Sequence, residues 1–186
     1  MRIIAGEARG LPLTQPPDGV RPTMDRVRGA IFSSLGDAVP GARILDLFAG
    51  SGAMGIEALS RGAASATFVD FNPKCSACVQ TNLHRAKLPG IVQTMDALKF
   101  VELYASEGFD LIFADPPYAK RDGDRDFAAE LLAMPALVQA LSPHGTLILE
   151  SVGGAPEPET CVLSLMRSKK YGTYHQELIL SYLSHG

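Results

Sequence analysis

The 186-residue sequence lacks long hydrophobic runs, paired cysteines and a strong excess of either charge. No apolar stretch approaches the ~20 residues that a membrane-spanning helix requires. The first residues, M-R-I-I-A-G, contain neither the apolar stretch nor the small-residue cleavage site of a secretory signal. We therefore expect a cytoplasmic protein that does not engage a membrane.

Cysteine and histidine are too sparse to indicate a disulfide framework or a metal centre. The chain has three cysteines, an odd number. Cys75 and Cys78 form a C-x-x-C pair, but the pair falls inside a predicted helix, and Cys161 has no second pair beside it. Free thiols are therefore a better interpretation than zinc or redox chemistry. The four histidines show no spacing typical of ligands, so we predict no metal site.

Charge is distributed unevenly along the chain. The net charge of −3 disfavours a protein that coats nucleic acid non-specifically. Residues 1–43 nevertheless contain six lysines or arginines against four acids, whereas residues 44–186 contain eleven against sixteen. A basic N-terminal portion permits contact with phosphate groups.

The order of apolar segments predicts an α/β fold. The sequence predicts strands at residues 43–48, 66–70, 91–95, 111–114, 145–150, 162–170 and 174–183. Helices alternate with the first five strands, the last of these helices at about residues 127–141. This order predicts a mainly parallel seven-stranded sheet whose last strand is antiparallel. We expect a single domain, residues 1–186, in which an N-terminal extension (1–40) precedes a core (41–186).

The N-terminal extension is predicted to form a small hairpin and a helix. Residues 2–13 contain two β-like pieces around glycines. Apolar residues then recur at intervals of three and four, the period of one helix face: Met24, Val27, Ile31 and Leu35. Thr23 is a suitable N-cap, and Gly36 ends the helix. Arg26 and Arg28 fall on the sides of this helix that the apolar residues leave exposed.

A glycine-rich turn follows the first core strand. Gly50, Gly52 and Gly55 match G-x-G-x-x-G, a pattern whose glycines let a ligand approach the backbone at the start of a helix. Asp70 follows Gly50 at about the 20-residue spacing of a ribose-binding acid. A dinucleotide-binding enzyme would show the same features. Asp46 favours S-adenosylmethionine instead, because a carboxylate repels a pyrophosphate but attracts the cationic methionine portion of that cofactor.

The strand at residues 111–114 ends abruptly in Asp115, Pro116, Pro117 and Tyr118. Proline has no N–H to donate and fixes its own φ, while the residue before it is held extended. An acid, bare carbonyls and an aromatic ring are thus held together at the carboxyl end of a strand, where open α/β sheets bind ligands. This cluster suits a planar amino group. Asp115 and the Pro116 carbonyl would accept its two hydrogens, and Tyr118 would stack beside it.

Three segments carry a resemblance to a known family. The tetrapeptide D-P-P-Y resembles the [N/D]-P-P-[Y/F/W] signature of S-adenosylmethionine-dependent methyltransferases that act on exocyclic or amide nitrogens. The starting M-R-I-I-A-G, the segment R-P-T-x-D-R-V-R-x-x-I-F-x-x-L and the loop D-L-F-A-G-S-G are similar to the RsmD-type methyltransferases of small-subunit ribosomal RNA. The resemblance covers nearly the whole chain. It implies a Rossmann-like class I methyltransferase that modifies the N2 amine of a guanine in 16S ribosomal RNA, free or in the assembling small subunit.

The resemblance also implies roles for individual residues. The catalytic residues that hold the acceptor base would be Asp115, Pro116, Pro117 and Tyr118. The residues that hold the cofactor, S-adenosylmethionine, would be Asp46, Phe48, Ala49, Gly50, Ser51, Gly52, Asp70, Asp96, Ala97 and Thr23. The RNA contacts would come from Arg21, Arg26 and Arg28. Asp70 is shorter than the glutamate that is more common in the family, and Asp96 is equally a candidate N-cap for a helix at residues 97–106.

Other functions would use some of the same residues. A DNA adenine-N6 or protein glutamine methyltransferase could use the same tetrapeptide, although the N-terminal R-P-T segment argues against both. An NAD-linked oxidoreductase explains the glycines but leaves D-P-P-Y without a role. A non-catalytic RNA-binding module explains the arginines alone. We expect a monomer, because the sequence shows neither a coiled-coil seam nor a broad apolar surface stripe.

Overall fold

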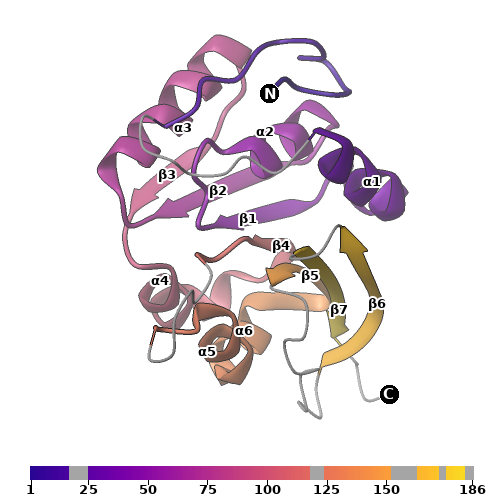
Figure 1. Ribbon diagram of the computed structural model, residues 1–186, viewed down its shortest axis with the longest axis vertical. Coiled ribbons are helices and arrows are strands. Elements are labelled where there is room, and N and C mark those ends of the chain that lie inside the picture. The colour runs from indigo at the N-terminus through magenta and orange to yellow at the C-terminus, as the bar shows by residue number, and fades with distance from the viewer. Residues whose placement is uncertain (17–24, 118–123, 152–162, 172–174, 183–186) are drawn as a thin grey trace. The chain divides into compact units, whose positions relative to one another are not determined.

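The computed structural model describes residues 1–16, 25–117, 124–151, 163–171 and 175–182. The chain divides into two compact units, Met1–Ala97 and Leu98–Gly186, each of which has strands and helices of its own (Figure 1). The expected single domain stays a prediction. Among the described residues, no helix is both long enough and apolar enough to cross a membrane.

The first unit contains three parallel strands in the order β3-β2-β1. Their bounds are Arg43–Leu47 for β1, Ser65–Asp70 for β2 and Ile91–Thr94 for β3. After its first residue each of β1 and β2 is buried throughout, as parallel strands covered on both faces are. The carboxyl ends of the three strands lie along one edge, because parallel strands all point the same way. This edge is where open α/β sheets bind ligands.

Two helices cover one face of these strands. The helix α2 (Ala53–Ser60) packs on β1 and β2, and α3 (Pro73–Ala86) packs on β2 and β3 (Figure 1). The start of α3 is fixed locally, since the Asn72 side chain accepts a hydrogen bond from the Lys74 N–H and Pro73 occupies the first turn. The start of α2 has no such cap, because its N-cap residue is Gly52.

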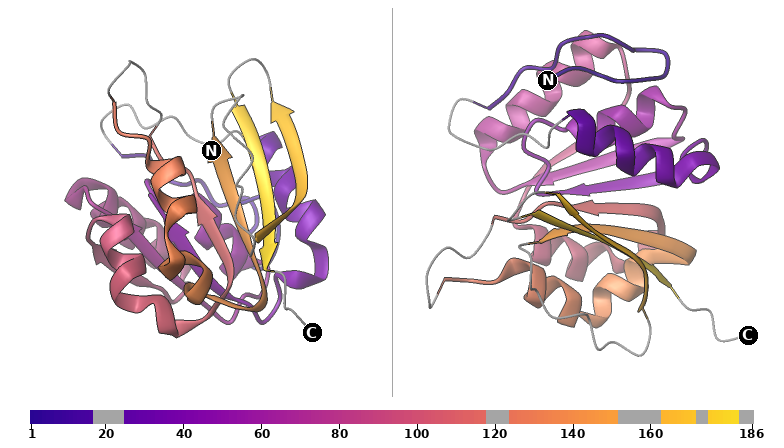
Figure 2. Two further views of the ribbon diagram at one scale, coloured as in Figure 1. Left: turned by 90° about the horizontal axis from the view of Figure 1, so that it is seen from below. Right: turned by 45° about the vertical axis from the view of Figure 1, so that its right-hand side comes forward.

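The N-terminal residues form the predicted hairpin. Arg2 and Pro12 make an antiparallel bridge, and the Ile3 N–H donates to the Leu11 carbonyl at 3.0 Å. This segment lies across α2 and α3, on the side of the helices away from the strands (Figure 2). The prediction of a hairpin over residues 2–13 is therefore confirmed.

The helix α1 (Asp25–Leu35) follows. It ends where predicted, because Gly36 adopts a left-handed φ of 48° and begins a short 3-10 helix, η1 (Gly36–Ala38). The predicted N-cap, Thr23, lies outside the described residues.

The second unit contains the remaining strands in the order β4-β5-β7-β6. Their bounds are Phe109–Ala114 for β4, Leu141–Ser151 for β5, Leu163–Tyr171 for β6 and His175–Tyr182 for β7. The strands β4 and β5 are parallel, whereas β7 is antiparallel to both β5 and β6. Together with the first unit, these pairings confirm the predicted α/β class and the antiparallel last strand. The helix α4 (Ala97–Tyr104) and the 3-10 helix η2 (Ala105–Glu107) precede β4.

One predicted helix was wrong in its extent. The sequence predicts a single helix over about residues 127–141, but the structure has two, α5 (Phe127–Ala133) and α6 (Pro135–Ala140). Met134 between them is extended, with φ −81° and ψ 118°. Pro135 explains the break, because proline disfavours a helical residue before it and has no N–H for the preceding turn.

Candidate cofactor and acceptor sites

The glycine-rich turn after β1 has an unusual backbone. Phe48, Gly50 and Gly52 have positive φ angles of 57°, 54° and 75°. Glycine adopts such angles readily, but a phenylalanine does so only when its surroundings hold it there. Ala49, Gly50, Ser51 and Gly52 are buried. The turn therefore has one defined shape, which the rest of the first unit has to maintain.

Asp70 holds this turn from the next strand. It ends β2, and its Oδ2 accepts a hydrogen bond from the Gly50 N–H at 2.8 Å, while its Oδ1 accepts from the Asn72 N–H at 2.9 Å. A carboxylate has about four lone-pair sites, so each oxygen keeps room for a further donor. The spacing between Gly50 and Asp70 in the sequence thus corresponds to a direct contact. Asp70 both shapes the turn and remains available to hydroxyl groups.

Asp46 supports the helix that follows the turn. Its side chain in β1 is 4% exposed, and its Oδ2 accepts a hydrogen bond from the Gly55 N–H at 2.9 Å. Burial raises the pKa of Asp46 to about 7; the hydrogen bond from Gly55 opposes this rise, and the charge of Asp70 adds to it. This carboxyl group therefore titrates near neutral pH.

The third glycine of the pattern has a packing role. A Cβ on Gly55 would lie 2.3 Å from the ring of Phe68 in β2. Only glycine lets α2 approach β2 this closely, which is the role expected of the last glycine in such a motif.

Asp96 and Ala97 follow β3 at the same edge of the strands. The Met95 N–H donates to the Asp70 carbonyl at 3.1 Å, which joins the ends of β2 and β3. Asp96 is half-buried, and Ala97 is 4% exposed and begins α4. Within the first unit, the structure thus brings together the predicted cofactor residues except Thr23, which lies outside the described part of the chain. Their roles stay predictions.

Phe71 is a residue that sequence reasoning passed over. It follows Asp70 directly and is 69% exposed, unusual for so large an apolar side chain. An exposed aromatic ring beside a carboxylate offers an apolar surface on which a planar base can pack. The hydrophobic pattern could not predict the exposure of Phe71. The strand β2 is buried on both faces, so its sequence has no alternation of apolar and polar residues that would indicate which side chains face solvent. The position of Phe71 directly after the acid was the available signal.

The candidate acceptor site lies in the second unit. Leu111, Ile112, Phe113 and Ala114 are each at most 2% exposed, so β4 is firmly anchored. At its carboxyl end Asp115 is half-buried, Pro116 is buried and Pro117 is exposed. Tyr118 lies outside the described residues. The structure therefore confirms the strand and its end but not the position of the ring.

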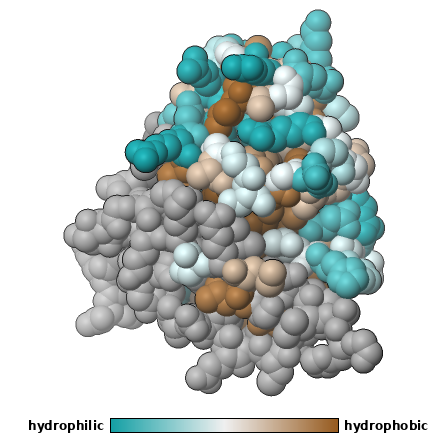
Figure 3. All heavy atoms as spheres, turned by 90° about the vertical axis from the view of Figure 1, so that its right-hand side faces the viewer, coloured by the Kyte–Doolittle hydropathy of each residue, from teal (hydrophilic) through white to brown (hydrophobic). Residues whose placement is uncertain are grey.

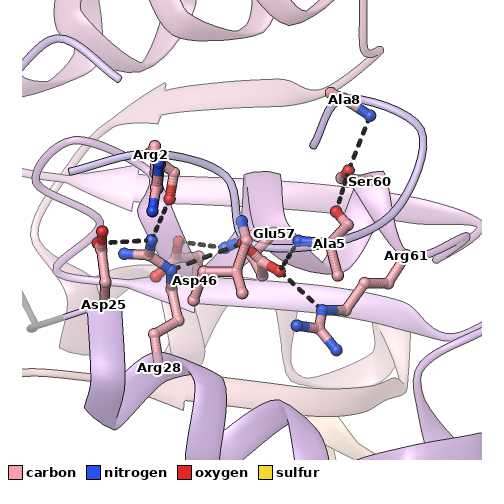
Figure 4. A network of polar contacts seen from close by, with 11 residues as sticks. Arg2, Ala5, Ala8, Asp25, Arg28, Asp46, Glu57, Ser60 and Arg61 are labelled. Atoms are coloured by element: carbon pink, nitrogen blue, oxygen red, sulfur yellow. Dashed lines mark hydrogen bonds and ion pairs between the residues drawn. The ribbon is translucent and has the colours of Figure 1, made fainter. Parts of the chain in front are cut away.

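One predicted RNA contact, Arg28, is wrong. Its side chain is fully buried, donates to Asp25 Oδ1 at 3.0 Å and to the Arg2 carbonyl, and lies 3.7 Å from Glu57 Oε2 (Figure 4). The buried face of α1 includes Arg28 beside Val27, because the buried carboxylate of Glu57 in α2 attracts a cation into this contact. The periodic pattern of apolar residues could not show that partner.

Arg26 is exposed and stays a candidate for contact with RNA. Hydrophilic side chains predominate over the described part of the face that carries α1, with smaller apolar areas among them (Figure 3). Arg21 lies outside the described residues.

Known proteins are similar to this chain along most of its length. A family model described as Conserved hypothetical protein 95 matches residues 1–180. The chain belongs to this family. A relative from Bacillus subtilis (strain 168), named "Putative rRNA methyltransferase YlbH", is 36% identical over 178 residues, which are 92% of this chain and 94% of that protein. Ribosomal RNA small subunit methyltransferase D of Escherichia coli (strain K12) is 41% identical over 125 residues, which are 64% of this chain and 61% of that protein.

Solved structures agree with this family membership. The Escherichia coli protein titled "Putative methyltransferase yhhF" is 32% identical with a TM-score of 0.77, over 99% of each chain. Solved structures at 16% and 14% identity, which show the fold alone, include methyltransferases in complex with S-adenosylhomocysteine (SAH). The predicted resemblance to the RsmD-type family and the predicted class I methyltransferase fold are therefore confirmed.

Proposed function

We propose that this member of the family methylates the N2 amine of a guanine in 16S ribosomal RNA, with S-adenosylmethionine as the methyl donor. The observation that carries the proposal is the acidic turn Asp115-Pro116-Pro117 at the end of the anchored strand β4. The named methyltransferase activity of the relatives supports it. A glycine turn flanked by two buried carboxylates in the first unit adds a suitable cofactor site.

The residues of the first unit fit S-adenosylmethionine chemically. Asp70 offers carboxylate oxygens to the two ribose hydroxyls, and Asp96 offers one to the adenine amino group. Asp46 supplies negative charge for the cationic methionine portion. Phe71 adds an exposed ring beside Asp70. A pyrophosphate would be repelled by the Asp46 carboxylate here, which disfavours NAD.

S-adenosylmethionine supplies a methyl group that its sulfonium already activates. The task of the chain is to position the acceptor nitrogen, whose lone pair is delocalised into the guanine ring. Asp115 and the Pro116 carbonyl accept the two amino hydrogens and so direct the lone pair outward. Such alignment contributes up to ~7 to 11 kcal/mol in well-oriented systems, so no strong general base is required. Tyr118 stacks on the base, a contact worth ~1 to 3 kcal/mol in comparable sites.

The RNA has to present an unpaired guanine, because a stacked base cannot enter such a turn. Arg26, with Arg21, contributes phosphate contacts. The partner is 16S ribosomal RNA, free or in the assembling small subunit. With this partner the protein acts in the cytoplasm. It acts as a monomer and without a metal.

Purified protein with radiolabelled S-adenosylmethionine tests this function. The substrates are naked 16S RNA and small subunits, both from cells that lack the gene for this protein. We expect label in one N2-methylguanosine, located by nuclease digestion and mass spectrometry. DNA is offered in a parallel reaction, and label in its adenine or in a glutamine of the subunit proteins would replace the proposal with one of those activities. Calorimetry should show binding of SAH and not of NAD, and binding of neither would indicate a non-catalytic module.

A further inference from the structure

The N-terminal segment is tied to the two helices that flank the cofactor turn. The Ile4 and Ala5 N–H groups donate to Glu57 of α2 at 2.7 and 3.1 Å (Figure 4). The Ala8 N–H donates to Ser60 Oγ at 3.0 Å. Glu57 is fully buried and the hydrogen bonds that it accepts are partly buried, so water competes with them only in part. The first part of the segment is therefore fixed to α2.

The end of the same segment is fixed to α3 by Asn82. Asn82 is fully buried, its Oδ1 accepts from the Thr14 N–H at 2.8 Å, and its Nδ2 donates to the Thr14 carbonyl at 2.9 Å. The other hydrogen of Nδ2 is directed to the Ser51 carbonyl, also at 2.9 Å. The Oδ1 atom faces one N–H donor, and the Nδ2 atom faces two carbonyl acceptors. Only one of the two orientations of the side-chain amide therefore satisfies all three partners.

Ser51 lies at the centre of the cofactor turn, between Gly50 and Gly52. Both glycines have left-handed φ angles, which glycine adopts readily among many others, so contacts from outside the turn have to select this conformation. The side-chain amide of Asn82 supplies a hydrogen-bond donor for the Ser51 carbonyl. Without that donor, a buried carbonyl would lose a hydrogen bond and the turn would gain freedom to rearrange.

We propose that Asn82 is a positioning residue that couples docking of the N-terminal segment to binding of the cofactor. The inference rests on the proposed function, in which the turn holds S-adenosylmethionine. When Thr14 is docked, its backbone orients the Asn82 amide toward Ser51 and so favours the binding-competent turn. Coupling between two sites is reciprocal, so cofactor binding has to strengthen the docking of the segment to the same degree.

Two neighbours of Asn82 provide a contrast. Arg85 donates to Thr14 Oγ1 at 2.9 Å, and Cys78 Sγ donates to the Thr14 carbonyl at 3.2 Å. Both hold the N-terminal segment through Thr14, whereas Asn82 also reaches Ser51. Because the hydrogen bond of Arg85 is exposed, Arg85→Ala is a matched control that weakens docking only slightly and keeps the bond between Asn82 and Ser51.

The test compares Asn82→Leu, a side chain of similar size without hydrogen-bonding groups, with Arg85→Ala. Calorimetry with SAH should show about tenfold weaker binding to Asn82→Leu, because hydrogen bonds of this kind change affinity by roughly that factor, and a much smaller loss for Arg85→Ala. The KM for S-adenosylmethionine should rise in Asn82→Leu with little change in kcat. Equal SAH affinity in wild type and Asn82→Leu would refute the inference.

Hydrogen exchange tests the coupling first in the wild-type protein, so this part of the test does not require a folded variant. In the wild-type protein, saturating SAH should slow exchange of the Ile4, Ala5 and Thr14 amides, which lie outside the cofactor turn. In Asn82→Leu this protection should disappear. If SAH binds the wild-type protein but leaves these amides unchanged, Asn82 is a structural residue only. If the wild-type protein does not bind SAH at all, the proposed function itself fails.

Discussion

The turn after β1 and the turn after β4 are both held in one shape, but by different means. The first is held by hydrogen bonds from elsewhere in its unit: Asp70 binds Gly50, and Asn82 binds Ser51. The second contains Pro116 and Pro117, which restrict their own backbone angles and the angles of the residues before them. One turn depends on tertiary contacts, and the other is fixed largely by its own sequence.

The difference indicates how each turn responds to substitution. A turn held by distant side chains should lose its shape when buried neighbours change, even if its own residues are kept. A turn stiffened by proline should tolerate distant changes and respond mainly to changes within it. Three substitutions test this contrast, in order of decreasing expected effect.

Replacement of Asp115 should have the largest effect. Asp115→Ala removes an acceptor for the amino group, so methyl transfer should fall by about 100-fold or more, the usual loss when one preorganised polar group is removed from an active site. SAH affinity, measured by calorimetry, should stay within about twofold of the wild type, because in the proposed function Asp115 holds the acceptor base and not the cofactor.

Asp115→Asn is the matched control for this substitution. Asparagine keeps one acceptor oxygen and also occurs at this position of the methyltransferase signature, so transfer should be reduced less than in Asp115→Ala. Single-turnover rates with saturating RNA measure both variants. Transfer by Asp115→Ala at nearly the wild-type rate would show that this carboxylate does not hold the acceptor.

Replacement of Gly55 should have the next largest effect and should act through folding. A Cβ in Gly55→Ala would meet the Phe68 ring at 2.3 Å, so α2 and the turn before it would have to shift. The free energy of unfolding should fall by roughly 1 to 3 kcal/mol, as for other overpacked sites. Urea unfolding at equilibrium measures the change.

Gly29→Ala provides the comparison for Gly55. Gly29 is also in a helix, but its Cβ would meet only Ile4 Cδ1, at an ordinary 3.7 Å. This substitution should leave stability unchanged or raise it by up to ~1 kcal/mol, the helix propensity difference between glycine and alanine. If Gly55→Ala and Gly29→Ala were equally stable, the close contact between α2 and β2 would not be needed. That contact would then not determine the position of the turn before α2.

Replacement of Asp46 should have the smallest effect, and it should appear as a change in pH dependence. The pKa of Asp46 is raised to about 7, so its charge develops between pH 6 and 8. Affinity for the cationic cofactor should rise over that range by up to about tenfold, because the ionised fraction grows from roughly one tenth to nine tenths. In Asp46→Asn the affinity should be independent of pH there. The KM for S-adenosylmethionine measured from pH 6 to 8 tests this.

Stability of the unliganded protein should show the opposite trend. Burial favours the protonated form of Asp46, so the folded state binds a proton more tightly than the unfolded state does. The free energy of unfolding should therefore fall as pH rises from about 4, the ordinary range of an aspartate, through the raised pKa. Asp46→Asn should lack this contribution. A wild-type slope equal to that of the variant would show that Asp46 does not titrate in this window.

Sequence reasoning succeeded where local chemistry determines the structure. Gly36 ends α1, the D-P-P segment ends β4, and the N-terminal hairpin forms, because the signals for each lie within a few residues. The same reasoning could have placed the break at Pro135, since the restriction on the residue before proline is equally local. The apolar residues before and after Pro135 have the period of one continuous helix, and the prediction followed that period instead of the proline.

The features that sequence reasoning missed depend on contacts between distant residues. Arg28 is buried because of Glu57, and Asn82 reaches both Thr14 and Ser51. A helical pattern shows which side chains are apolar, but it does not show that a buried acid on another helix attracts a cation, or that an asparagine bridges two loops. Such pairings become visible only when the segments are placed together.

One end strand of each unit, β3 in the first and β6 in the second, has a feature that discourages aggregation. The strand β3 is at the outer side of its unit and is only four residues long. The outer strand of the other unit, β6, has a register shift between Leu165 and Arg167 that interrupts its regular pairing. Short or bulged edge strands are poor templates for the addition of a strand from another molecule. Addition of a strand from another molecule at β3 or at β6 should therefore be unfavourable.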